Sequence, residues 1–306
     1  MIEVLEQNTF LKNLVYRLIR KHISGTTINT AFKLTKSLND KDMPATITFL
    51  NENVSDTGKA RYNLNSYIQL VKQISRLNLN ASVSVRLSQL GFSLPNGIIE
   101  RNMLALLTTA KSSKVSMWLE YEDSIGLNRL VETCRRYGNL YDGIGVELPL
   151  QHQSIDQAVD NLPRASAVKL ISHYNMGGLG EKKAGKSQAK QKGAIDMYSY
   201  YIDKLYKRKT AICIQEPDEK TVYRLAKANK QYKRDLIFEL PLGYSKRWQS
   251  KFMKEKMKVG VYIPYGKDWI PYAINKLTEG RIRELAVSIL DGKTETGGGN
   301  EKPRKG

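Results

Sequence analysis

Polar and charged side chains lie in or just after the C-terminal half of several short apolar runs in this chain. They are Arg86, Gln89, Glu120, Glu147, Lys169, Ser172, His173, Gln215 and Glu239. A strand covered by helices should be apolar throughout, and a buried charge is costly unless it is paired or faces a wet pocket. We therefore expect these side chains to line a binding or catalytic site. The alternative is a set of internal ion pairs, Arg86 with Glu120 and Lys169 with Glu147.

The stretch 259–279 joins a strand-like apolar run, a Tyr-Gly turn and an aromatic-rich helix. Its rings, Tyr262, Tyr265, Trp269 and Tyr272, could form an aromatic wall for a ring-shaped ligand. Ordinary packing in the core and at its rim explains the same rings equally well. Both interpretations stay open at the level of sequence.

Residues 180–187 match the phosphate-loop pattern G-x-x-x-x-G-K-[ST]. In that pattern Lys186 would bind the outer phosphates and Ser187 a magnesium ion. The context argues against this, because the preceding apolar run ends at 173 and the segment after Ser187 is a poor start for a helix. We expect a basic loop over the mouth of the site, and nucleotide binding stays an alternative function.

Short apolar runs alternate with segments of helical period along most of the chain. Helical patterns at 8–22 and 25–39 come first. The apolar runs lie at 45–50, 81–87, 115–121, 143–150, 167–173, 210–215, 236–242 and 258–265, and a helical pattern follows each one. Ser124, Ser154 and Ser245 are candidate helix caps. Repeated β-then-α units predict parallel strands, and eight of them predict a closed (β/α)8 barrel. An open doubly wound sheet is the alternative.

These patterns divide the chain into three predicted parts. Residues 1–40 form an N-terminal helical extension, 41–290 the barrel, and 291–306 a basic tail that has too little apolar surface to fold. With 306 residues, 41% of them hydrophobic, the chain can bury a large core. Cys134 and Cys213 lie in apolar patterns and are expected to be buried thiols in a reducing compartment.

The net charge of +19 favours contact with something anionic, but a soluble protein with lysine-rich helices explains the same charge and is the preferred interpretation. Peripheral contact with an anionic membrane surface is one expectation, and nucleic acid is not an expected partner. The N-terminus has no signal-peptide pattern and the chain has no apolar stretch of membrane-spanning length, so we expect a cytoplasmic protein. Three histidines and no Cys/His cluster argue against a zinc site.

Several motifs, in this order, make the chain resemble the monofunctional proline dehydrogenase family over about residues 25–290. They are Ser24-Gly-Thr-Thr, Ala45-Thr-Ile-Thr-Phe-Leu-Asn-Glu52, Ser84-Val-Arg-Leu-Ser-Gln-Leu-Gly91, Glu120-Tyr-Glu-Asp-Ser124 and Tyr262-Ile-Pro-Tyr-Gly-Lys-Asp-Trp269. The resemblance implies a distorted (β/α)8 barrel that holds FAD. It also implies oxidation of L-proline, or a related cyclic amino acid, to pyrroline-5-carboxylate, with a quinone or another electron acceptor.

The resemblance also suggests roles for individual residues. Catalytic roles fall to Lys169, Arg86 and Glu120, with Lys169 donating to the flavin. Substrate binding falls to Lys276, Asn275, Tyr262, Tyr265, Tyr272 and Glu279. Cofactor binding falls to Lys169, Glu147, Ser172, Gln215 and Glu239.

This sequence departs from the family at the residues that the family uses for chemistry. The Arg-Arg pair that clamps the substrate carboxylate is Asn275-Lys276 here, so two guanidinium groups become one ammonium. Two family glutamines become Glu147 and Glu239, and the arginine that donates to the flavin becomes Lys169. We expect weak proline turnover. A catalytically lapsed barrel that serves as a binding or regulatory protein is the alternative function.

Overall fold

The computed structural model describes residues 7–51, 54–163, 166–171, 188–215, 219–230, 235–243 and 246–278. Its contacts divide the chain into two units, one comprising Arg20–Trp269 and one comprising Met1–Ile19 with Ile270–Gly306. The boundaries predicted at residues 40 and 290 stay predictions. The tail predicted at 291–306 lies outside the described residues.

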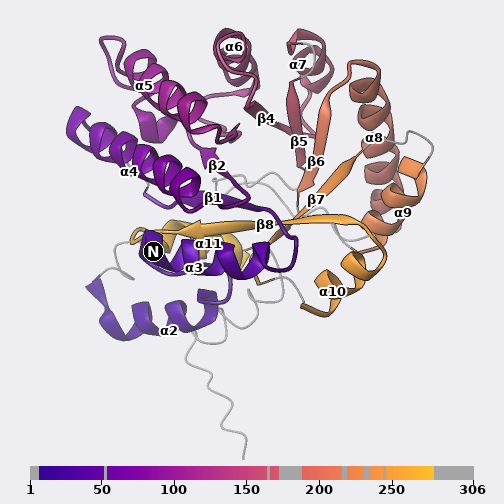
Figure 1. Ribbon diagram of the computed structural model, residues 1–306, viewed down its shortest axis with the longest axis horizontal. Helices are drawn as coiled ribbons and strands as arrows, with labels where there is room; N and C mark the ends of the chain where they lie inside the picture. Colours follow the sequence, from indigo (N-terminus) through magenta and orange to yellow (C-terminus); the bar gives the residue numbers. More distant parts are fainter. Residues whose placement is uncertain are drawn as a thin grey trace, which may run out of the picture. The chain divides into compact units, whose positions relative to one another are not determined.

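The larger unit is a closed barrel of parallel strands that pair in chain order, with the last strand paired to the first (Figure 1). The strands are β1 (Ala45–Phe49), β2 (Ala81–Val85), β3 (Met117–Leu119), β4 (Ile144–Pro149), β5 (Ala167–Ile171), β6 (Ala211–Gln215), β7 (Leu236–Pro241) and β8 (Lys258–Tyr265). The predicted (β/α)8 barrel is confirmed, and the open-sheet alternative is wrong.

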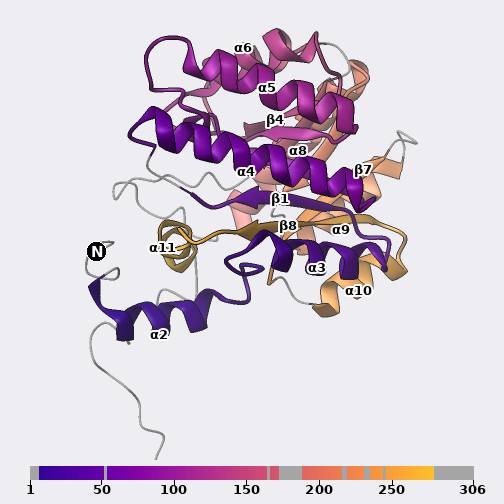
Figure 2. The same cartoon turned by 60° about the vertical axis from the view of Figure 1, so that its left-hand side comes forward.

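Helices surround the barrel and connect successive strands, while α3 packs outside β1 and β8 (Figure 1). Figure 2 shows α4 and α5 lying side by side. The helices of this unit are α3 (Ile28–Asn39), α4 (Thr57–Arg76), η1 (Ser88–Leu90, a 3-10 turn), α5 (Ile98–Ser113), α6 (Leu127–Gly138), α7 (Ile155–Asn161), α8 (Gln188–Lys207), α9 (Glu219–Asn229) and α10 (Lys246–Lys254).

The helix starts follow local capping chemistry only in part. The Asp56 carboxylate accepts the Lys59 N–H at 2.9 Å, so α4 begins at Thr57. Ser124 is not a cap, because α6 begins at Leu127 with Gly126 before it. Ser154 precedes α7 without a capping hydrogen bond from its side chain, and Ser245 lies outside the described residues.

The hydrophobic core fills the space between the strands and the surrounding helices. Strand residues such as Ile47, Val83 and Val146 are fully buried there. The other face of the sheet lines the barrel interior, since successive strand residues point to opposite faces. Branched apolar residues usually fill such an interior. This barrel places polar residues there, and Thr46 bonds to Ser82 across neighbouring strands.

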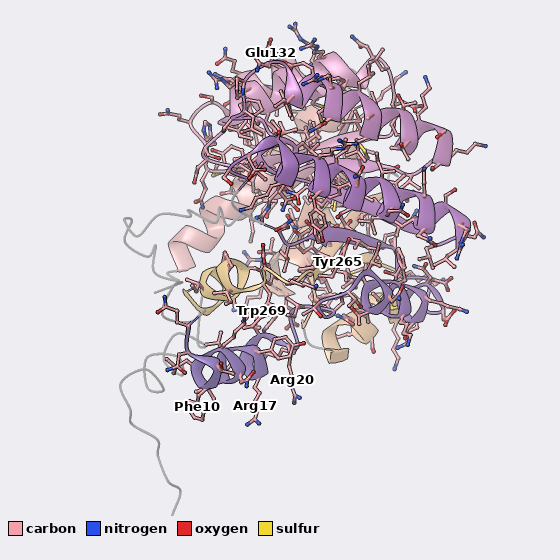
Figure 3. All side chains as sticks on the ribbon, turned by 90° about the vertical axis from the view of Figure 1, so that its left-hand side faces the viewer. Phe10, Arg17, Arg20, Glu132, Tyr265 and Trp269 are labelled. Carbon is pink, nitrogen blue, oxygen red and sulfur yellow. The ribbon has the colours of Figure 1, made fainter. Side chains whose placement is uncertain are left out.

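The smaller unit, as far as it is described, consists of α2 (Thr9–Ile19) and α11 (Ile270–Thr278), which contact each other. In α2, Val15 and Ile19 are buried, whereas Phe10 is 76% exposed and projects from the helix in Figure 3. The helical pattern predicted at 8–22 is thus confirmed over most of its length.

The structure can be compared with two further expectations, on the cysteines and on membrane-spanning helices. Cys134 and Cys213 are both buried free thiols, as predicted. Among the helices of the described ranges, none combines the length and the apolar character needed to cross a bilayer.

Candidate functional site

A buried carboxylate links the C-terminal ends of β2 and β3 to β8. Glu120 directly follows β3 and is 5% exposed. Its Oε2 lies 2.7 Å from Nε of Arg86, and its Oε1 accepts the hydroxyl of Tyr262 at 2.6 Å. Burial alone would raise the pKa of Glu120, but the Arg86 guanidinium and the Tyr262 hydroxyl hold it below its usual value.

A second group surrounds the ammonium of Lys169 inside the barrel. Lys169 is in the middle of β5 and is completely buried. Its Nζ lies 2.8 Å from Oε2 of Glu239 and 3.5 Å from Oε1 of Glu147. Two ring centres are also near Nζ, that of Trp118 at 4.9 Å and that of Tyr262 at 5.7 Å. Burial would lower the pKa of Lys169, but the two carboxylates outweigh it and raise the pKa above its usual value.

The two carboxylates of this second group have different surroundings. The other oxygen of Glu239 accepts the hydroxyl of Thr46, so both of its oxygens are bonded. Glu147 accepts the backbone N–H of Tyr121 at 3.2 Å through Oε2, while its Oε1 is buried and has no hydrogen-bond partner among the described residues. Burial raises the pKa of Glu147 to about 8; Lys169 opposes the rise, and Glu120 and Glu239 add to it.

Both ion pairs weighed from the sequence are therefore present. Arg86 pairs with Glu120, and Lys169 lies next to Glu147, its partner in strand register. The nearer carboxylate to Lys169 is nevertheless Glu239, from a strand beyond β6. Tyr262 joins the groups, because its hydroxyl contacts Glu120 and its ring faces Lys169.

The remaining predicted site residues are divided between the barrel, α11 and undescribed segments. Gln215 is buried beside Glu239 in strand register. Tyr265 ends β8, and its ring packs against that of Phe49 with centres 5.4 Å apart. Tyr272, Asn275 and Lys276 lie in α11, and Tyr272 is buried. Three predictions lie outside the described residues: Ser172, Glu279 and the 180–187 loop.

Sequence reasoning missed two contributors to the Lys169 group. Thr46 looks like any strand-forming residue, yet its hydroxyl bonds to Glu239. The position of the Trp118 ring could have been inferred from a glycine in the neighbouring strand. Gly145 sits beside it in register, and any Cβ at Gly145 would overlap the indole ring. A glycine inside a strand often marks such a close approach.

A polar hollow of about 280 Å³ opens beside Arg86, among the segments that follow β1, β2 and β3. Ser88, Gln89 and the half-buried Glu122 also line it. Glu122 is held by the backbone N–H of Ser88 at 3.1 Å and by the Ser88 hydroxyl. The hollow thus presents a guanidinium and a carboxyl group in one small space at the end of the barrel where active sites lie.

Comparison with known proteins links this geometry to one group of enzymes. No family model matches the chain. It is 24% identical to proline dehydrogenase 2 of Bacillus subtilis (strain 168) over 264 residues, which cover 85% of each chain. It is 22% identical to proline dehydrogenase 1 of the same strain over 262 residues, covering 85% of this chain and 86% of the relative.

Solved structures show the same barrel. Proline utilization A from Bdellovibrio bacteriovorus superposes with a TM-score of 0.72 at 14% identity, over 93% of this chain and 35% of that one. Proline utilization A from Corynebacterium freiburgense gives 0.66 at 14% identity, with the same coverage. The chain thus spans about a third of these proteins, and the likeness to them supports the fold. The resemblance expected from the motifs is confirmed: over most of its length, the chain is similar in sequence to proline dehydrogenases.

Proposed function

We propose that this protein is a proline dehydrogenase-like flavoenzyme, which oxidises L-proline to pyrroline-5-carboxylate. The observation that carries the proposal is the similarity to two proline dehydrogenases over 85% of the chain. FAD, when bound, would supply the hydride acceptor, which no protein side chain can replace. For the final electron acceptor we propose a quinone or a similar molecule.

The side chains inside the barrel offer hydrogen-bonding groups of the types that a flavin ring can bind. A flavin ring edge carries hydrogen-bond acceptors and an N–H donor. Lys169 is a buried donor near two aromatic rings, and Oε1 of Glu147, which lies 3.5 Å from the Lys169 Nζ and has no hydrogen-bond partner among the described residues, is a buried acceptor. We propose that Lys169, Glu147, Gln215 and Glu239 lie toward the flavin, with Ser172 added on the strength of the resemblance.

The hollow beside Arg86 supports an amino acid as the substrate. An amino acid at neutral pH carries a carboxylate and an ammonium, and the hollow is lined by the Arg86 guanidinium and the Glu122 carboxyl group. Charge-assisted hydrogen bonds to such groups are about twice as strong as neutral ones. We propose that Arg86 binds the substrate carboxylate. The resemblance assigns carboxylate binding to Lys276 as well, and we propose that role for it.

Glu120 and Tyr262 act in this proposal as positioning residues. Glu120 holds the Arg86 guanidinium at one oxygen and Tyr262 at the other, so a single carboxylate fixes a cation and an aromatic ring. The fixed orientation saves the entropy of ordering both side chains when the substrate arrives. Tyr262 would then form one wall of the substrate pocket.

The test is a visible absorption spectrum of the purified protein, followed by dye reduction with L-proline and with D-proline as a control substrate. We expect a flavin spectrum, slow L-proline-dependent dye reduction, and a raised KM in Arg86→Met. Arg136→Met, which removes an exposed arginine on α6, is the matched control and should leave KM unchanged. A protein that takes up no FAD, or that holds FAD without oxidising L-proline, would contradict the proposal.

A further inference from the structure

The Lys169 ammonium already has two carboxyl groups of the protein beside it. Both carboxylates lie within 4 Å of Nζ, Glu239 at 2.8 Å and Glu147 at 3.5 Å. All three side chains are buried, and Lys169 has no exposed surface at all. A buried ammonium held in this way cannot turn to a new acceptor without leaving a carboxylate behind, and an unpaired buried charge is costly.

Glu239 is the better anchored of the two carboxylates. Thr46 on β1, two strands away from β7, donates to its other oxygen, so the carboxylate cannot easily swing away from Lys169. Glu147 is fixed at one oxygen by the Tyr121 backbone N–H, and its other oxygen faces Lys169. The protein itself therefore supplies the acceptors that Lys169 needs.

We propose that Glu147 and Glu239 are an internal competitor for Lys169, so that a flavin ring binds in this barrel only by displacing them from the ammonium. The inference rests on the proposed function, because it concerns the affinity of the same site for FAD. It deepens that function by identifying two residues that weaken flavin binding. Their effect should be larger for the reduced ring, whose negative charge meets the carboxylates of Glu120 and Glu239, and that of Glu147 where it is ionised, beside the two cations Arg86 and Lys169.

The experiment compares FAD dissociation constants of wild-type apoprotein and of Glu147→Gln/Glu239→Gln, measured by the quenching of flavin fluorescence. Amides keep the side-chain shape but do not hold an ammonium as strongly. We expect the double variant to bind FAD about ten- to a hundredfold more tightly, the range of one charge-assisted hydrogen bond. The midpoint potential of the bound flavin should rise, by about 30 mV for each tenfold preference for the reduced form.

A double-mutant cycle separates competition from a general effect of charge. Removing two carboxylates favours any anionic ligand, whether or not Lys169 is present. Competition for Lys169 predicts that the same two substitutions tighten FAD binding much less in a Lys169→Met background. Glu132→Gln removes an exposed carboxylate on α6 and should leave FAD affinity near the wild-type value. Equal gains in both backgrounds, or no gain at all, would overturn the inference.

A folded variant is available even if the double variant is unstable. Glu239→Gln alone leaves Glu147 to pair with Lys169, so it should fold and show a smaller tightening in the same direction, after circular dichroism has confirmed the fold. If the wild-type protein binds FAD and oxidises proline, but neither Glu239→Gln nor a folded double variant binds FAD more tightly, the proposed competition is wrong. The proposed function then still stands. If no variant binds FAD, the proposed function fails, and the competitor fails with it.

Discussion

The Tyr262 hydroxyl donates to Glu120 at 2.6 Å, and this bond joins the Arg86 and Lys169 groups inside the barrel. The carboxylate also holds Arg86, while the Tyr262 ring lies 5.7 Å from the Lys169 ammonium. One side chain therefore contributes a polar contact to one cation site and a π-face to the other. Separating these two contributions is the purpose of the first prediction.

Tyr262→Phe keeps the ring and removes the hydroxyl. Glu120 loses a donor in a buried place, so we expect a loss of about 1–3 kcal/mol in the free energy of unfolding at neutral pH. The native pKa of Glu120 lies below its usual value, so its stabilising contribution is present above that value and is lost as pH falls through the native pKa. The variant should therefore approach the wild type in acid. Urea unfolding at several pH values measures this.

Tyr265→Phe is the control for that experiment. Tyr265 lies on the same strand, but its ring packs against Phe49. Its substitution should cost less than that of Tyr262 at neutral pH. If the Tyr262→Phe deficit stayed the same from neutral to acid pH, the hydroxyl would not be acting through an ionised Glu120.

Glu147 should make stability fall as pH rises. Its native pKa is raised to about 8 by burial, with Lys169 opposing and Glu120 and Glu239 reinforcing the rise. The native state then holds a proton that the unfolded state has lost between its ordinary pKa, about 4.3, and the native value. The contribution of Glu147 to the free energy of unfolding is fully present below the ordinary pKa. It declines by about 1.4 kcal/mol per pH unit between the ordinary pKa and the native pKa.

The measurement is urea unfolding of wild type and Glu147→Gln across that pH window. The amide cannot ionise, so the variant should gain on the wild type as pH rises, and the difference should level off above the native pKa. The backbone N–H of Tyr121 can still donate to the amide oxygen, which keeps the local geometry. A constant difference across the window would mean that Glu147 does not titrate there.

Lys169→Met should be among the most destabilising single changes in the barrel. It leaves Glu239, and Glu147 where ionised, without a countercharge in a buried place, for which we expect a loss of about 3–5 kcal/mol. Adding Glu239→Gln should recover part of this loss, because the pair is then removed as a unit. Urea unfolding of the two single variants and the double variant gives the coupling energy. Strictly additive losses would show that the 2.8 Å contact contributes no pairwise energy.

The barrel was predictable because every strand is an apolar run and every connection has helical period. The charges in the strands likewise pointed to the buried ionic residues Glu120, Glu147, Lys169 and Glu239 and to the partly buried Arg86. The pairing of Lys169 with Glu147 follows from adjacent strands, which the order of the chain supplies. The closer pairing with Glu239 reaches past β6, and no local pattern indicates which side chains meet across a barrel interior.

Small residues were the hardest part of the site to predict. Thr46 is a favourable strand residue on any face, so its hydroxyl bond to Glu239 left no mark in the sequence. The aromatic stretch was ambiguous for a related reason, since a ring packs equally well in a core or in a pocket. The structure places the two rings differently: Tyr262 faces Lys169, while Tyr265 packs on Phe49.

Gly145→Ala tests whether the glycine in β4 makes room for Trp118. A Cβ at this position would overlap the indole ring, which has Lys169 on its face. We expect a loss of about 1–3 kcal/mol from overpacking, measured by urea unfolding. Gly193→Ala is the control, since a Cβ there meets open space on the exposed side of α8 and should stabilise the helix by about 0.5–1 kcal/mol. Equal effects at the two glycines would contradict the packing argument.

Asn275→Arg/Lys276→Arg should raise kcat/KM for L-proline. Both residues lie in α11, and the resemblance to proline dehydrogenases implies that two arginines at these positions would clamp the substrate carboxylate. A guanidinium presents a planar fork to a carboxylate, which neither an amide nor an ammonium can match. Restoring one charge-assisted bond should gain about one to two orders of magnitude. The measurement is steady-state proline:dye oxidoreduction with flavin content determined in each protein, and Lys207→Arg, an exposed change on α8, is the control. Wild-type turnover as fast as that of the double variant would show that the carboxylate clamp does not limit this protein.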